Sequence, residues 1–156
     1  MRIHRLELTA YGPFPGTITL DFDDLNREGI FLLNGPTGSG KSSILDAICF
    51  ALYGTTSSGR TDLKSRFAEP HVQPRVILDC TIGTDRYRID RSPAYERPKK
   101  RGQGTITEQA KTLVEKFDAT TGSWEPDPAI TRHKDAGDFM LSVLGLNAQQ
   151  LSLIHI

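Results

Sequence analysis

The sequence lacks the features that mark membrane-spanning, exported and disulfide-stapled proteins. No apolar run in its 156 residues reaches the roughly 18–20 residues that a membrane-spanning helix needs. The N-terminal segment MRIHRLELTA contains no apolar stretch of the kind found in secretory signal peptides. The two cysteines, Cys49 and Cys80, have no CxxC spacing, which excludes a disulfide framework or a zinc site as the organising feature. We therefore expect a cytoplasmic protein without a membrane partner.

The chain also has no excess of charge of either sign, because 19 Lys and Arg residues balance 19 Asp and Glu residues. The segment from Arg86 to Gly104 departs from this balance, with seven basic and two acidic residues. Such a cluster either contacts the phosphate backbone of a nucleic acid or keeps an exposed loop solvated. Lys99, Lys100 and Arg101 are the candidate DNA-contacting residues, and both interpretations stay open.

Hydrophobic periodicity predicts two antiparallel strand pairs. Alternating apolar residues flank a Gly- and Pro-rich turn at 11–16, and a second alternating pair surrounds Gly83. The continuous apolar run 30–33 favours a central strand covered on both faces. Residues 91–104 are expected to form a loop, and residues 105–118 fit either a helix or a strand, with a strand favoured for the second half.

Three helices are predicted from apolar spacing and end signals. The first spans 41–53 and ends at Gly54, and the second spans 135–144 and ends at Gly145. A third begins after Asn147, where Asn147 and Gln150 have the spacing of a capping box.

The most specific motif is a glycine-rich segment that matches G-x-x-x-x-G-K-[ST]. Glycines adopt backbone angles closed to other residues and leave room for a phosphate, while successive N–H groups converge on the anion at the start of the next helix. Lys41 is expected to contact the β and γ phosphates, and the Ser42 hydroxyl to ligate Mg²⁺. The predicted phosphate site comprises Gly35, Pro36, Thr37, Gly38, Ser39, Gly40, Lys41, Ser42 and Ser43.

Three segments carry a family resemblance: MRIHRLELTAYGPFPG, FLLNGPTGSGKSSILDAICFALYG and RSPAYERPKKRGQGT. Over residues 1–150 the sequence resembles the N-terminal ATPase lobe of the SbcC subunits of bacterial SbcCD nucleases, in the SMC-like branch of the ABC ATPases. The resemblance implies an α/β P-loop NTPase fold of ABC/SMC type, a partial head domain with a mixed central sheet and an antiparallel β subdomain. Residues 151–156 are expected to form a tail outside the family pattern.

The resemblance also implies a function in DNA double-strand-break repair and recombination, with ATP and Mg²⁺ as cofactors. The implied partners are an SbcD-like nuclease subunit, a second copy of the ATPase head in a homodimer, and double-stranded DNA ends. A long coiled coil would separate the two lobes of the full-length head. The turn 11–14 is expected to lie near the nucleotide base, or only to join two strands.

Several catalytic parts of that family do not occur in this sequence. It has no leucine-serine-glycine-glycine signature, no heptad run and no apolar strand that ends in Asp-Glu. Gln149 and Gln150 belong to a helix start and are not assigned as the catalytic glutamine. No complete catalytic set is predicted, so we expect this fragment to bind ATP weakly and to hydrolyse it at near-background rates.

Three alternatives stay open. A P-loop phosphotransferase would need a further metal ligand, for which Asp79 is the candidate, although the alternation around it favours a hairpin strand. The second is a different ABC-type ATPase, and the third is a fragment that binds ATP without an activity of its own. Asp46 is expected to be a solvated or salt-bridged helix residue, and Cys49 and Cys80 are expected in the core.

Overall fold

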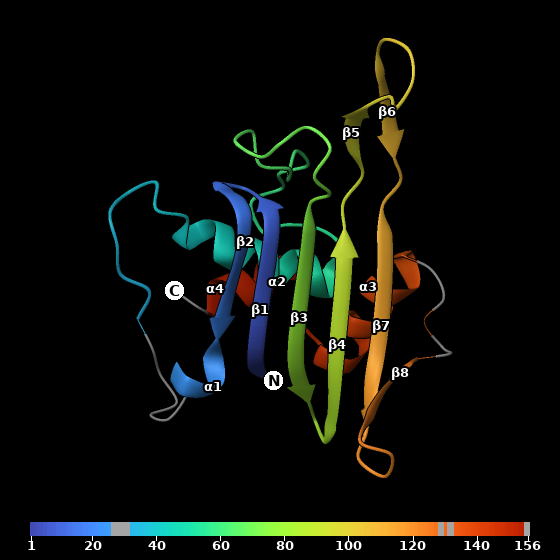
Figure 1. Ribbon diagram of the computed structural model, residues 1–156. Helices are drawn as coiled ribbons and strands as arrows, with labels where there is room; N and C mark the ends of the chain where they lie inside the picture. The colour runs from blue at the N-terminus through green and yellow to red at the C-terminus, as the bar shows by residue number, and fades with distance from the viewer. Residues whose placement is uncertain (26–31, 128–129, 131–132, 155–156) are drawn as a thin grey trace.

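The computed structural model describes residues 1–25, 32–127, 130 and 133–154. Its main sheet contains β1 (Arg2–Tyr11), β2 (Phe14–Asp21), β3 (Arg75–Ile82), β4 (Asp85–Ser92), β7 (Lys111–Asp118) and β8 (Ser123–Pro126). The strands follow the spatial order β2-β1-β3-β4-β7-β8, and every described pair is antiparallel. Figure 1 shows the helices α2 (Lys41–Tyr53), α3 (His133–Leu144) and α4 (Ala148–Ile154) together behind this sheet.

Strand alternation sets the inner face of the sheet. Leu6 and Leu8 of β1, Leu78 of β3 and Ile89 of β4 are fully buried on the side that faces α2. Because successive side chains of a strand point to opposite faces, this pattern fixes the register of the pairs Leu6–Leu78 and Leu78–Ile89. The two predicted antiparallel pairs are therefore confirmed.

The parallel component of the expected mixed sheet is not found among the described strands. A further central strand was expected at the apolar run 30–33, of which 30 and 31 lie outside the described residues. Leu32 and Leu33 belong to no strand, and the Leu32 side chain is 87% exposed. A continuous apolar run suits a central strand only where both faces of the sheet are covered, and the exposed Leu32 side chain is not covered.

The expected loop at 91–104 is wrong, because the chain continues as a β ribbon. The strands β5 (Tyr95–Pro98) and β6 (Thr105–Glu108) pair with each other beyond the ends of β4 and β7. Figure 1 shows this ribbon projecting past the edge of the main sheet. Pro93, which has no N–H group to donate, lies at the interruption between β4 and β5. The strand favoured for the second half of 105–118 is confirmed as β7.

The predicted helices are found with small shifts at their ends. Helix α2 ends at Gly54, which has a φ of 76° and donates its N–H to the Phe50 carbonyl at 2.8 Å. The capping box is present before α4, since Asn147 Oδ1 accepts from the Gln150 N–H at 2.9 Å and Gln150 Oε1 accepts from the Asn147 N–H at 3.0 Å.

A buried arginine closes the C-terminal end of α2. The Arg91 side chain is fully buried, and its guanidinium donates from Nε to the Ala51 carbonyl at 2.6 Å and from Nη2 to the Leu52 carbonyl at 3.2 Å. It also donates to Thr112 Oγ1 at 3.2 Å, and burial lowers the pKa of Arg91 to about 10. A cation at a helix C-terminus compensates the negative end of the helix dipole. Arg91 thereby joins α2 to β4.

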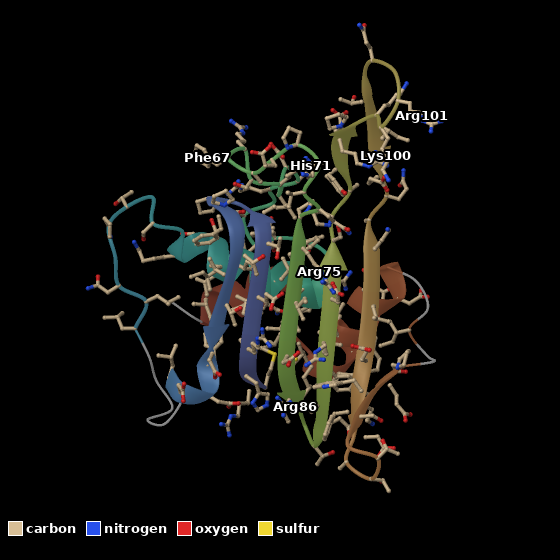
Figure 2. All side chains as sticks on the ribbon, viewed as in Figure 1. Phe67, His71, Arg75, Arg86, Lys100 and Arg101 are labelled. Carbon is tan, nitrogen blue, oxygen red and sulfur yellow. The ribbon has the colours of Figure 1, made fainter. Side chains whose placement is uncertain are left out.

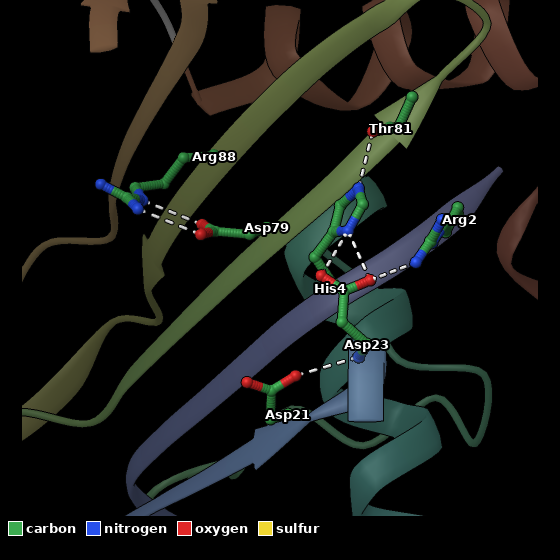
Figure 3. Close-up of polar contacts among 7 residues, drawn as sticks. All are labelled: Arg2, His4, Asp21, Asp23, Asp79, Thr81 and Arg88. Carbon is green, nitrogen blue, oxygen red and sulfur yellow. Dashed lines mark hydrogen bonds and ion pairs between the residues drawn. The ribbon is translucent and has the colours of Figure 1, made fainter. Parts of the chain in front are cut away.

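A polar cluster joins the short helix α1 (Phe22–Leu25) to the sheet (Figure 3). His4 Nδ1 lies 2.9 Å from both carboxylate oxygens of Asp23, and His4 Nε2 lies 2.7 Å from Thr81 Oγ1. Arg2 also donates to Asp23 at 2.7 Å. Hydrogen bonds from His4 and Arg2 hold the pKa of Asp23 below its usual value.

Among the described residues, no helix combines the length and the hydropathy that a membrane span requires.

Candidate phosphate-binding site

The glycine-rich loop runs directly into the N-terminus of α2. Gly38 and Gly40 have φ values of 86° and 96°, a region that side chains strongly disfavour. Gly40 is the N-cap of α2 and has no side chain to cap the N–H groups of the first turn. The positive end of a 13-residue helix therefore faces the loop.

Lys41 lies across this loop and is held by its acceptors. Its Nζ donates to the Gly35 carbonyl at 2.6 Å and to the Pro36 carbonyl at 2.8 Å, and it lies 3.5 Å from Ser39 Oγ. These contacts keep an ammonium group at the centre of the loop. Phosphate oxygens entering the loop would replace these neutral carbonyl acceptors with anionic ones, which adds ion-pair attraction to the hydrogen bonds of the ammonium.

The loop has the steric properties of an anion cradle. A Cβ at Gly40 would lie 2.5 Å from Phe14 Cζ at a φ of 96°, so this position needs glycine, whereas a Cβ at Gly35 would lie 2.9 Å from Ser39 Oγ, which would have to rotate away. A Cβ at Gly38 would meet no atom within 4 Å, which leaves open space over the centre of the loop. The residues present therefore fit a bound phosphate chain.

The turn between β1 and β2 packs on the same loop. Phe14 and Pro13 contact Gly40, and a Cβ at Gly12 would lie 3.2 Å from Ser43 Oγ. Gly12 has a φ of 55°, as this tight approach of turn and helix requires. The turn predicted near the nucleotide is thus brought against the loop, and its contact with a base stays a prediction.

The loop opens into a cavity of about 660 Å³. Predicted residues on its wall are Thr37, Gly38, Gly40, Lys41, Ser42 and Ser43. Gly35, Pro36 and Ser39 instead contact Lys41 from the loop. The assigned roles, including Ser42 as a Mg²⁺ ligand, stay predictions.

Sequence reasoning missed a second part of the wall of this cavity. It is formed by the segment after α2, which contributes Arg60, Asp62, Lys64, Arg66 and Phe67. With Lys41, the wall carries four cationic side chains and one carboxylate, a balance that favours a polyanion. The signal in the sequence was the recurrence of basic residues at 60, 64 and 66 after the phosphate loop.

Asp46 supports that wall from inside the molecule, so its expected solvated or salt-bridged position is wrong. The side chain is 5% exposed, and its carboxylate accepts from the Ser57 and Ser58 hydroxyls at 2.7 Å each. It also accepts from the Ser58 backbone N–H at 3.2 Å. A buried carboxylate requires such donors, and here they attach the chain after α2 to the helix.

Asp79 lies away from the phosphate loop. It is in β3, as the alternation predicted, and its carboxylate accepts from Arg88 Nε at 2.8 Å and Nη2 at 3.0 Å (Figure 3). It pairs in register with Arg5, whereas the loop packs beyond Tyr11, roughly 20 Å further along β1 at 3.3 Å per residue. The structure therefore does not bring the candidate metal ligand of the phosphotransferase alternative to Ser42.

The two cysteines are buried, as predicted. Burial raises the pKa of Cys49 to about 11 and that of Cys80 to about 12, so both are protonated near neutral pH. No cluster of three or more His, Cys, Asp or Glu side chains arranged to hold a metal occurs in the part of the chain that the structure describes.

The basic segment 86–104 is not a single patch. Arg91 is buried at α2, Arg88 is paired with Asp79, and Arg97 forms an ion pair with Glu108. The predicted DNA-contacting residues Lys99, Lys100 and Arg101 are exposed at the end of the β5–β6 ribbon, where Figure 2 labels Lys100 and Arg101. Their separation from the sheet leaves both the DNA contact and the solvated arm as interpretations.

Comparison with known proteins shows the family. A family model described as an AAA domain matches residues 5–155. The chain is 48% identical over 118 residues to the SbcC component of the Vibrio cholerae SbcCD nuclease, a match covering 73% of the chain and 12% of that protein. It is 35% identical over 151 residues to the SbcC component from Lactococcus lactis and 32% identical over 161 residues to that from Staphylococcus saprophyticus.

The last two matches cover 96% and 100% of the chain, but 14% and 15% of those proteins. The chain thus spans about a seventh or less of the length of these relatives. This similarity fits an N-terminal fragment of an SbcC protein, and the chain belongs to the family described as an AAA domain.

Proposed function

We propose that this chain is the ATP-binding lobe of an SbcC-type protein, an SMC-like ABC ATPase. ATP is bound with its phosphates in the loop 35–43 and with Mg²⁺ at the Ser42 hydroxyl. The observation that carries the proposal is the position of the Lys41 ammonium, held 2.6 Å from the Gly35 carbonyl at the N-terminus of α2 and open to the cavity.

The chain's own residues divide the work in this site. Lys41 and the N-terminus of α2 supply positive charge to the phosphates, and Ser42 supplies one oxygen ligand to the metal. Arg60, Lys64 and Arg66 add positive charge on the second part of the wall. Magnesium, when bound, neutralises charge between the β and γ phosphates. These residues bind and orient the nucleotide, and the groups that would position an attacking water are expected in another lobe.

Calorimetric titration with MgATP tests this assignment. Lys41→Ala should weaken binding at least tenfold, because it removes a charged donor from the site. Lys116→Ala is the matched control. Lys116 carries the same charge, but it is in β7, where its Nζ lies 2.9 Å from the Asp85 carboxylate. Equal affinity of the wild-type chain and Lys41→Ala would contradict the proposal.

The metal assignment has a separate test. Wild-type affinity for ATP should rise when Mg²⁺ is added, and Ser42→Ala should lose most of this increase because its hydroxyl ligand is gone. Ser142→Ala is the control, since Ser142 is an exposed serine of α3 that does not line the cavity. An undiminished Mg²⁺ effect in Ser42→Ala would remove Ser42 from the metal site.

The expected partners follow from the relatives, whose names identify them as components of the SbcCD nuclease. We propose that the lobe pairs with an SbcD-like nuclease subunit and, through ATP, with a second head. Supplying the C-terminal lobe of an SbcC protein in trans tests this. ATP-dependent association supports the proposal, phosphate transfer to a small acceptor favours a phosphotransferase, and nucleotide binding with neither outcome indicates a binding fragment.

Double-stranded DNA ends are the proposed substrate, and the end of the β5–β6 ribbon is the proposed contact. The exposure of Lys99, Lys100 and Arg101 favours it over a contact made by the paired arginines of β4. The triple alanine variant should bind duplex DNA more weakly and with a smaller salt dependence. An Arg2, Arg5 and Arg86 triple alanine variant removes equal charge elsewhere, and equal DNA binding by both variants would exclude the ribbon.

A further inference from the structure

One aromatic side chain is exposed at the rim of the phosphate cavity. Phe67 is 78% exposed and lines this cavity together with Thr37 and Lys41. Figure 2 shows it at the end of the loop that extends beyond the strands β1 and β2. Of the described residues on the cavity wall, Phe67 is the one aromatic. An exposed ring here exposes apolar area to water without packing against the core.

The backbone that carries Phe67 is nevertheless firmly held. The Ser65 N–H donates to the Ala10 carbonyl at 2.7 Å, and the Gly12 N–H donates to the Leu63 carbonyl at 3.0 Å, so residues 63–65 pair with the end of β1. Leu63 and Ser65 are buried. The Ala68 N–H then donates to the Ser65 carbonyl at 3.2 Å and closes a tight turn around Phe67. The ring is therefore exposed on a fixed support.

The polar neighbours of Phe67 have contacts of their own. Lys64 Nζ donates to the Pro70 carbonyl at 2.6 Å and lies 4.7 Å from the centroid of the Tyr95 ring. Arg66 lies 3.6 Å from the Asp62 carboxylate. Lys64 Nζ is thus engaged by Pro70 and Tyr95, and Arg66 and Asp62 form an exposed ion pair, which leaves the Phe67 ring as the apolar part of this wall.

A nucleoside triphosphate has one strongly anionic end and one flat, weakly polar end. The cavity offers groups for both ends, since Lys41 and the α2 N-terminus supply positive charge and Phe67 is the one aromatic ring among the described residues of its wall. We propose that Phe67 is the platform on which the base of the bound nucleotide stacks. This inference rests on the proposed nucleotide function and names the part of the site that distinguishes a nucleotide from an inorganic polyphosphate.

The test compares MgATP with magnesium tripolyphosphate, which has the phosphates but no base. Phe67→Ala should bind MgATP roughly tenfold more weakly than the wild-type chain, because base–aromatic stacking is lost. Its affinity for tripolyphosphate should equal that of the wild-type chain. GTP should lose affinity by a similar factor, since any purine offers a π face. Ile106→Ala is the control, an exposed apolar side chain on β6 outside the cavity wall.

A spectroscopic readout tests contact directly. In a Trp124→Phe background, Phe67→Trp should retain ATP affinity, and the fluorescence of the introduced indole should change with MgATP but not with tripolyphosphate. Trp124 is the chain's one natural tryptophan, so the background removes its signal.

The outcomes separate this inference from the proposed function. If Phe67→Ala weakens ATP and tripolyphosphate equally, the ring supports the loop and is not a base platform. If it changes neither affinity, the ring does not contact the nucleotide, and the proposal is overturned. If the wild-type chain binds neither ligand, the phosphate site itself is refuted, and the platform with it.

Discussion

At the scale of single residues, buried polar groups join the elements that build the site. Asp46 attaches the segment after α2 to the helix through Ser57 and Ser58, and Arg91 holds the other end of α2 against β4. Neither role was visible in the sequence, where Asp46 fits a solvated or salt-bridged helix position and Arg91 belongs to a basic run. Side-chain partners distant in sequence decide such roles, and apolar periodicity does not encode them.

Replacing the buried Arg91 tests its capping role. Arg91→Met should lower the free energy of unfolding by about 3 kcal/mol, because the Ala51 and Leu52 carbonyls lose their charged donor. Arg86→Met is the control on the same strand, since Arg86 is exposed and should change stability by less than about 1 kcal/mol. Urea unfolding measures both, and equal losses would show that Arg91 is not a special contact.

The buried thiol of Cys80 predicts a loss of stability at alkaline pH. Burial raises the pKa of Cys80 from 9.0 to about 12, so its contribution to stability is complete below pH 9 and is lost as the pH rises toward 12. Between these values the free energy of unfolding should fall more steeply in the wild-type chain than in Cys80→Ala, by at most about 1.4 kcal/mol per pH unit. Urea unfolding at several pH values measures this slope, and parallel curves would contradict it.

At the scale of elements, local signals predicted the strands and helices well. Glycine stops, the capping box and strand alternation are short-range features, and α2, α4 and the first two strand pairs follow them. The prediction of a loop at 91–104 was wrong because the polar and basic residues there show no strand pattern. Strand β5 forms in this segment through its pairing with β6. The loop 35–42 was evident because its glycine spacing is itself the structural requirement.

Gly40 tests how tightly the β1–β2 turn packs on the phosphate loop. Gly40→Ala and Gly83→Ala both place a side chain at positive φ, which costs roughly 1–2 kcal/mol. Only at Gly40 would the new Cβ also meet Phe14, at 2.5 Å, whereas Gly83 has open space. Thermal or urea unfolding should therefore show a loss at Gly40 larger by about 1–3 kcal/mol. Equal losses of stability in the two variants would mean that the β1–β2 turn moves away from the new Cβ at little cost.

At the scale of the whole molecule, an antiparallel sheet, one helical layer and a projecting ribbon place the phosphate loop at one end of β1. The sequence predicted the loop side of the cavity, but not the wall formed by 60–67. That wall exists because Ser65 and Leu63 pair with the end of β1, a contact between segments about 50 residues apart that no local pattern announces.

The most direct measurement of the central claim is the location of nucleotide contact along the chain. In a ¹⁵N-resolved NMR titration with a non-hydrolysable MgATP analogue, the largest amide shifts should fall at Gly38 to Ser43, where the loop meets α2. Amides of the β5–β6 ribbon should change little. Shifts confined to other segments, or no saturable shift at Gly38 to Ser43, would contradict the account.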